Sequence, residues 1–256
     1  MNCRVLPHEI GDGPANMALD ESLLDSADAN PTSAIFRTYA WSEPTLSLGY
    51  FQTAEELAQD ARWNTVSLVR RITGGGALWH HHELTYALIV PRAHPLAERP
   101  ANLYREVHAA IKDLLIAQGF PATRRGETET EKRAARPFLC FLDRDSEDLL
   151  LADRKVVGSA QRRRPAAVLQ HGSLLLGVSS TTPELPGLRE LSKQVCDVEF
   201  WSKALGEGLP AALGFATHED AVSPLERSHA SVLARTRYRD SEWTLHRRRA
   251  SRQEVS

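Results

Sequence analysis

Three consecutive glycines at positions 74–76 restrict the folding of this chain more than any other feature. Glycine has no β-carbon and adopts positive φ easily, so the run interrupts both helix and strand. It follows Val66–Arg70, a short apolar run that predicts a strand, and Arg71. A ligand could lie against the bare backbone N–H groups, although a plain hairpin turn explains the glycines as well. The spacing fits neither a P-loop nor a dinucleotide-binding turn.

The remainder of the first half is predicted to be rich in strands. A helix is expected over Pro14–Leu24, because proline suits the first helical turn. A second helix is expected over Ala101–Gln118, where five apolar residues recur at helical spacing and Gly119 follows as a C-terminal cap. Further strands are expected at Ala34–Tyr39, Thr45–Phe51 and, paired or continuous, Ala77–Val90.

The second half changes from strands to helices. Residues 121–136 are polar and are predicted to form a loop, with a mobile lid as a hypothesis. From about residue 186 the pattern is helical, and Ser223 opens a capping box before a helix that reaches about Tyr238. We expect one domain over residues 1–256. Strands are expected at Phe138–Phe141, in a hairpin of Asp148–Leu151 with Lys155–Gln161, and at Ala167–Leu176.

Composition argues against several classes of protein. The net charge of -2 gives no global basic field of the kind that nucleic-acid binding needs. No apolar stretch is long enough to span a membrane, and the first residues do not resemble a secretory signal. Three widely spaced cysteines, Cys3, Cys140 and Cys196, fit neither a disulfide framework nor a structural zinc site. A reducing cytoplasm is therefore expected.

A second motif lies in the predicted hairpin. Strict alternation would place Lys155, Val157 and Ser159 on one face, where the lysine could hold a carbonyl or phosphate oxygen. Gly158 and Gly172 would let another chain approach the sheet closely. Only five of the 31 basic residues are lysines, so a lysine among motif residues stands out. The alternative is an exposed hairpin with an ordinary surface lysine.

The histidine run His80–His82 suggests a metal site, since alternation puts His80 and His82 on one face. No cysteine or carboxylate nearby completes a ligand set with recognisable spacing. We therefore predict no metal and expect these histidines to be hydrogen-bonded or to line a site.

Taken together, the motifs resemble the lipoate-protein ligase and octanoyltransferase superfamily, whose catalytic fold is shared with biotin ligases. The resemblance rests on R-R-x-T-G-G-G-x-x-x-H from Arg70, K-V-V-G-S-A-Q-x-R from Lys155, and Q-H-G-S from Gln170. It extends to Gly13–Glu21, Trp41–Gln52 and Tyr238–Trp243, and so covers nearly the whole chain. It implies an α/β (α+β) fold with mixed and antiparallel sheets flanked by helices.

Within the superfamily, the chain is most similar to cysteine-type octanoyltransferases that act with the glycine-cleavage H protein, because Cys140-Phe141 precedes the lysine strand. This resemblance implies that Cys140 takes octanoate from acyl carrier protein as a thioester, and that a lysine of the H protein or a lipoyl domain then attacks it. Lys155 would be the acyl-site lysine. The acyl- or lipoyl-binding residues would be Arg71, Gly74, Gly75, Gly76, His80, Gly158, Ser159, Gln161, His171 and Gly172.

This chemistry needs no cofactor, because thioester exchange is nearly isoenergetic and cysteine is a strong nucleophile. Basic clusters such as Arg162–Arg164 would attract acidic carrier and lipoyl domains. The first alternative is a lipoate ligase that uses ATP and Mg and forms lipoyl-AMP without needing Cys140. A biotin ligase ranks behind it, and a non-catalytic binder of lipoyl or acyl-carrier domains is the alternative from another class. The acceptor, the chain length and the oligomeric state stay open.

Overall fold

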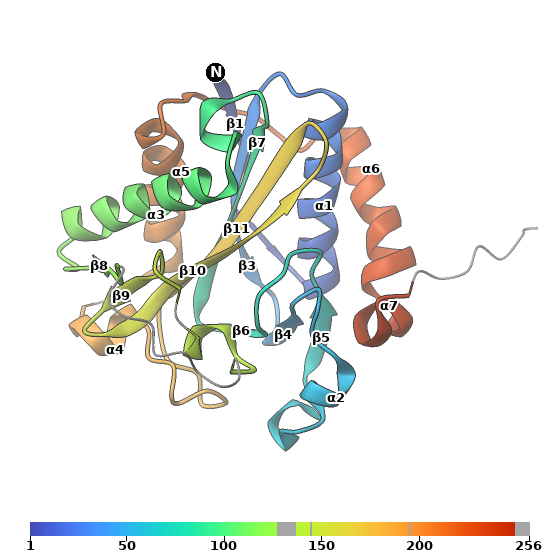
Figure 1. The fold of residues 1–256 in the computed structure, drawn as a ribbon, viewed down its shortest axis with the longest axis vertical. Coiled ribbons are helices and arrows are strands. Elements are labelled where there is room, and N and C mark those ends of the chain that lie inside the picture. The colour runs from blue at the N-terminus through green and yellow to red at the C-terminus, as the bar shows by residue number, and fades with distance from the viewer. Residues whose placement is uncertain (127–136, 144, 195, 249–256) are drawn as a thin grey trace, which may run out of the picture.

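The computed structural model describes residues 1–126, 137–143, 145–194 and 196–248, arranged as helices on both faces of a large sheet (Figure 1). The nine strands of this sheet follow the order β12-β1-β3-β7-β11-β10-β9-β8, and β2 pairs with β3 at one end. They are β1 (Asn2–Val5), β2 (Glu9–Gly11), β3 (Ala34–Trp41), β7 (Glu83–Pro91), β8 (Thr123–Arg124), β9 (Leu149–Leu151), β10 (Arg154–Arg163), β11 (Ala167–Leu175) and β12 (Ala216–Glu219).

A second, smaller sheet has the order β5-β4-β6 and lies at one end of the large sheet (Figure 1). It consists of β4 (Thr45–Leu48), β5 (Ser67–Arg70) and β6 (Leu78–His80). Strands β4 and β5 run parallel, whereas β4 and β6 are antiparallel. The glycine run at 74–76 joins β5 to β6, so the small sheet fixes both ends of that turn.

The helices divide between the two faces of the large sheet (Figure 1). One face carries α1 (Gly13–Ala29), α6 (Pro224–Leu233), the π-helical turn η4 (Ala234–Tyr238) and α7 (Ser241–His246), and the other carries α3 (Pro100–Ala117) and α5 (Val198–Ala212). Shorter pieces are α2 (Ala54–Leu57), α4 (Leu188–Ser192) and the 3₁₀ turns η1 (Ala61–Trp63), η2 (Pro95–Ala97) and η3 (Cys140–Leu142). Within the described residues, no helix is long and apolar enough to cross a bilayer.

The two central strands explain the layered packing. Every residue of β7 and of β11 is buried, so both faces of the sheet need apolar cover. Tyr86 and Leu88 pack towards α3 and α5, whereas Ala87 and Ile89 pack towards α1. The alternation of a strand therefore supplies two separate cores.

Most of the predicted elements are confirmed. The α/β class with mixed and antiparallel sheets is correct, the helix predicted at Ala101–Gln118 is α3, and Gly119 follows it with φ of +82°. The capping box at Ser223 is present, with Pro224 opening the helix. The hairpin of β9 with β10 also forms.

Other predictions need correction. The strand expected at Phe138–Phe141 is a single bridge from Leu139 to Ala77 followed by the η3 turn, because the segment pairs with one residue of a distant turn and not with a strand. The region beyond residue 186 is not wholly helical, since β12 adds a strand beside β1. Of the predicted loop at 121–136, residues 127–136 lie outside the described part of the chain.

Candidate acyl-transfer site

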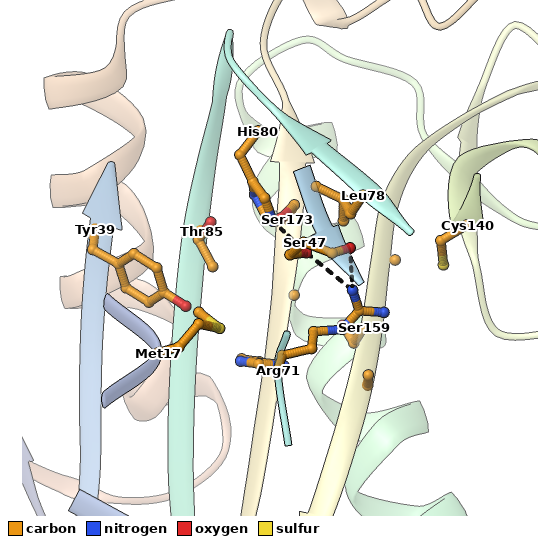
Figure 2. Close-up of a pocket in the computed structure, with 14 residues that line it drawn as sticks. Met17, Tyr39, Ser47, Arg71, Leu78, His80, Thr85, Cys140, Ser159 and Ser173 are labelled. Carbon is orange, nitrogen blue, oxygen red and sulfur yellow. Dashed lines mark hydrogen bonds between the residues drawn. The ribbon is translucent and has the colours of Figure 1, made fainter. Parts of the chain in front are cut away.

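A cavity with about 400 Å³ of empty space lies between the large and small sheets (Figure 2). Its deeper wall comes from α1 and from β3, β7 and β11, and its other end reaches the η3 turn. The lining residues are Met17, Tyr39, Ser47, Arg71, Leu78, His80, Thr85, Cys140, Gly158, Ser159, Ala160, His171, Gly172 and Ser173. The cavity is a slot with methionine, tyrosine and leucine side chains and a cysteine at one end.

Cys140 and Lys155 lie in contact at this end. The Nζ of Lys155 is 3.8 Å from the Sγ of Cys140 and 3.2 Å from its carbonyl oxygen. The same ammonium group lies 2.8 Å from the Oδ2 of Asp148. Burial lowers the pKa of Lys155, but the negative charge of an ionised Cys140 and of Asp148 outweighs burial and raises that pKa overall. Lys155 therefore stays cationic beside the sulfur.

A β-bulge puts Lys155 on this face. The register of β10 against β9 shifts between Lys155 and Val157, so the strict alternation that the sequence predicts fails there. Val157 packs into the core beneath α3 and α5, whereas Lys155 turns towards Cys140. A β-carbon on Gly158 would lie 2.6 Å from the Cε of Lys155. Gly158 thus leaves the space through which the lysine reaches Cys140.

The glycine turn holds the cysteine segment and does not itself line the cavity. Gly75 has φ of +89°, and the guanidinium of Arg71 donates to the carbonyl oxygens of Gly74 and Gly76 at 2.9 and 2.6 Å. A β-carbon on Gly76 would lie 2.9 Å from the carbonyl oxygen of Phe138. The turn therefore provides the surface on which the cysteine segment rests.

Backbone hydrogen bonds also hold the cysteine segment in place. The N–H of Cys140 donates to the carbonyl oxygen of Ala77 at 2.8 Å, and the N–H of Ala77 donates to that of Phe138, also at 2.8 Å. Gln52 reaches across from the loop after β4 and donates to the same Phe138 oxygen at 3.1 Å. The position of the thiol is thus set by three chain segments that are distant in sequence.

Arg71 is the second positive charge near the thiol. Its guanidinium is buried, and its hydrogen bonds within the described residues go to carbonyl oxygens and to the hydroxyl of Ser47 (Figure 2). Burial lowers the pKa of Arg71, and an ionised Cys140 partly offsets that effect. Arg71 has no carboxylate partner in this part of the chain, so its positive charge is available to an anion bound in the cavity.

The two predicted site histidines are held on both ring nitrogens. His80 contacts the hydroxyl of Ser47 at 2.8 Å and the carboxylate of Glu83 at 2.9 Å, and it stacks on Trp41. Burial lowers the pKa of His80, so its ring is neutral at pH 7. These contacts make His80 a fixed wall of the cavity.

His171 contacts the hydroxyl of Thr73 at 2.7 Å and the carboxylate of Asp20 at 2.9 Å. It forms the wall of the cavity next to α1, which carries Asp20. Among the residues that the structure describes, no group of three or more histidines, cysteines and carboxylates could hold a metal ion. Both site histidines therefore have ordinary hydrogen-bonded surroundings.

Ser159, Gln161 and Gly172 lie at the boundary of the site. The Ser159 hydroxyl points away from the cavity and contacts the hydroxyl of Tyr86 and the Nε2 of His108, each at 2.6 Å. A β-carbon on Gly172 would lie 2.3 Å from that Ser159 oxygen. Gln161 is not among the lining residues, because its amide donates to the Gln170 side chain at 2.7 Å.

Sequence reasoning missed part of the cavity wall. Thr85 and Ser173 are cross-strand partners in the register of β7 with β11 and face the cavity together. Met17 and Tyr39 lie at the end of the cavity away from Cys140 (Figure 2). The sequence carries a signal for the first pair, since each of two wholly buried strands has a small hydroxyl residue on the face that bears Ala87 and His171.

Comparison with known proteins agrees with this geometry. The family model of the lipoyl protein ligase A/B catalytic domain matches residues 12–198. The octanoyltransferase LipM of Geobacillus kaustophilus is 30% identical over 91% of this chain and 94% of its own length. The LipM of Symbiobacterium thermophilum is 30% identical over 95% and 98%. Because these octanoyltransferases match nearly the whole chain, the protein is an acyltransferase.

Solved structures show the same fold. A putative lipoate protein ligase from T. acidophilum with bound lipoic acid has a TM-score of 0.78 at 23% identity, covering 96% of this chain and 100% of that one. A lipoate-protein ligase A bound with ATP has a TM-score of 0.73 at 24% identity, covering 96% and 99%. Because the family model matches most of this chain, the chain belongs to the lipoyl protein ligase A/B catalytic domain family.

Proposed function

We propose that this protein transfers an octanoyl group from acyl carrier protein, through a thioester on Cys140, to a lysine of an acceptor such as the glycine-cleavage H protein or a lipoyl domain. The observation that carries the proposal is the contact of 3.8 Å between the Nζ of Lys155 and the Sγ of Cys140 at the end of the cavity. A nucleophile, a fixed cation and a slot for a chain are the components that acyl transfer needs.

In the first step, the thiolate of Cys140 attacks the donor carbonyl carbon. A new C–S bond forms, the C–S bond to the carrier breaks, and the departing thiolate takes up a proton. Lys155 and Arg71 stabilise the negative charge, first on sulfur and then on the carbonyl oxygen. The octanoyl chain occupies the slot lined by Met17, Tyr39 and Leu78.

In the second step, the neutral ε-amine of the acceptor lysine attacks the thioester. A C–N bond forms, the bond to Cys140 breaks, and the amine proton passes to the thiolate or to solvent. Neither step consumes ATP, because a thioester is already an activated acyl group. We therefore propose that the reaction requires no nucleotide, metal or other cofactor.

Charge near the site supports an acidic protein partner. Arg162 and Arg247 lie over the ring of Tyr50, with guanidinium carbons 5.5 and 5.9 Å from its centre. Neither arginine makes an ion pair with a described residue. Arg164, by contrast, is paired with Glu21 and Asp25. Unpaired arginines beside the loop that contacts the glycine turn would attract an acidic carrier or lipoyl domain.

The test is acylation without ATP. The protein is incubated with octanoyl carrier protein and analysed by intact mass and by peptide mapping, and we expect one octanoyl group on Cys140. Cys140→Ser is the test variant, and Cys196→Ser is the control because Cys196 is a buried cysteine away from the cavity. Acceptor modification that demands ATP and survives Cys140→Ser would establish the ligase alternative. Binding without any acyl transfer would establish the non-catalytic alternative.

A further inference from the structure

A second cavity, with about 660 Å³ of empty space, adjoins the reacting atoms on the far side of Lys155. It is lined by Pro137, Phe141, Leu142, Arg154, Lys155, Glu184, Leu185 and Pro186, none of which lines the first cavity. Cys140 belongs to the first cavity and Lys155 to the second. The contact of 3.8 Å between Nζ and Sγ is therefore the point where the two cavities meet.

Transfer of an acyl group to a thiol needs space for two groups at once. The acyl chain needs one site, and the thiol that departs needs another on the opposite side of the carbonyl carbon. The first cavity has Cys140 among its lining residues and is the proposed site of the acyl chain, so the departing thiol needs another site. We propose that the second cavity receives the pantetheine arm of the donor thioester, an inference that rests on the function proposed above.

The walls of the second cavity suit such an arm. Pantetheine is a thin chain of methylene groups interrupted by two amides, so it needs apolar contact together with a few polar partners. Phe141, Leu142 and Leu185 supply apolar surface. Arg154, which also lines the cavity, donates to the carbonyl oxygen of Glu184. No carboxylate in the described residues pairs with Arg154, which leaves N–H groups for an amide carbonyl.

The carboxylate of Glu184 leaves no unbalanced negative charge in the second cavity. This carboxylate is 2.8 Å from the guanidinium of Arg62, so its charge is balanced outside the cavity. Lys155 also lies 5.2 Å from the centre of the Phe141 ring, which places its charge between the apolar wall and the sulfur. The pantetheine thiolate would leave the acyl carbon on the side of this ammonium and take up a proton from solvent there, while the acyl group, now on Cys140, stays in the first cavity.

The experiment compares two donors that differ only in the thiol arm. Octanoyl-pantetheine fills the second cavity, whereas octanoyl-mercaptoethanol has no amide and hardly enters it. The rate of Cys140 acylation is followed by intact mass for Leu185→Trp and Arg154→Ala in the full chain. Leu225→Trp, on an exposed residue of α6, and Arg235→Ala, on an exposed residue of η4, are the matched controls.

We expect Leu185→Trp to slow acylation by octanoyl-pantetheine about tenfold or more, and by octanoyl-mercaptoethanol less than about twofold. Arg154→Ala should raise the octanoyl-pantetheine concentration for half-maximal rate about fivefold, which corresponds to one lost hydrogen bond. Equal slowing with both donors, or none with either, would overturn the inference while leaving Cys140 acylation intact. Weakened MgATP binding in these variants, with unchanged thioester use, would assign the cavity to a nucleotide. Failure of every thioester to acylate Cys140 would instead contradict the proposed function.

Discussion

The carbonyl oxygen of Gly75 lies 1.9 Å from the point where a β-carbon on Gly49 would stand. The loop after β4 and the glycine turn after β5 are therefore packed backbone to backbone. The same turn also contacts the backbone of the cysteine segment. A displacement of the turn by a larger residue at Gly49 would therefore also displace Cys140.

Gly49→Ala should accordingly damage both stability and acylation. The overlap involves backbone and cannot be relieved by rotating a side chain, so we expect a loss on the order of 2 kcal/mol in the free energy of unfolding. Chemical denaturation measures it. Gly206→Ala is the control, because its new β-carbon would meet only Val5 at an ordinary 3.9 Å in the middle of α5. A Gly49→Ala protein with unchanged stability and acylation would contradict this packing.

Gly158→Ala separates catalysis from stability. Its β-carbon would lie 2.6 Å from the Cε and 3.0 Å from the Nζ of Lys155, which is the movable end of a side chain. The lysine can swing aside without moving the backbone, but only by leaving Cys140. We expect the acylation rate to fall about tenfold or more, the loss typical of one misplaced stabilising group, and the melting temperature to fall less than in Gly49→Ala, where the clash is with backbone. Retained acylation would show that Lys155 does not assist the transfer.

Asp148→Asn tests the charge on Lys155. Asp148 is one of the groups that raise the pKa of Lys155, so its removal lowers that pKa. If the ammonium is needed, the alkaline limb of the acylation profile should move to lower pH in the variant. Stopped-flow acylation across a series of buffers measures this limb. An unmoved limb, in a variant that melts like the parent, would exclude Lys155 as the titrating group.

Behind β10, hydrogen bonds link Gln170, Tyr86, Ser159, His108 and the carbonyl oxygen of Glu147, and each group in this series donates to the next. The Nδ1 of His108 faces the carbonyl oxygen of Glu147 and so carries the proton, which leaves its Nε2 to accept from Ser159. Ser159 then accepts from Tyr86, which accepts from Gln170. Burial lowers the pKa of His108 to about 4 and keeps its ring neutral.

This histidine should make the protein sensitive to mild acid. Between the unfolded pKa of about 6.5 and the folded value of about 4, only the unfolded chain binds the proton, so stability falls as pH drops through that window. We expect a loss on the order of 2–3 kcal/mol from this group. In His108→Gln, urea unfolding should depend less on pH. His218→Gln, at an exposed position, should keep the parent slope, and an unchanged slope in His108→Gln would refute the assignment.

The sequence allowed the meeting of Cys140 with Lys155 to be predicted, because both belong to motifs shared with a known family. It did not reveal how they meet. Alternation placed Lys155 with Ser159, whereas the bulge sends them to opposite faces, and a bulge depends on the pairing of β9 with β10. The apolar residues at 138–141 predict a strand, but the structure has only a bridge from Leu139 to Ala77, which lies far away in sequence, followed by the η3 turn.

The role of His108 could not be predicted from the sequence for a similar reason. This histidine lies on α3 among apolar residues at helical spacing, and nothing local distinguishes it from a surface histidine. Its role follows from its contact with Ser159, which lies on β10, 51 residues further along the chain. Contacts between distant segments are set by packing, and periodicity within one segment does not report them.

The pairing of β12 with β1 has a consequence for biosynthesis. Asn2–Val5 is made long before one of its two neighbours, Ala216–Glu219, because the two strands lie far apart in the sequence. Until then the outer edge of β1 presents free backbone groups to any other extended peptide. A nascent chain stalled before residue 216 should therefore be more prone to pair with foreign strands and to be held by chaperones than the completed polypeptide.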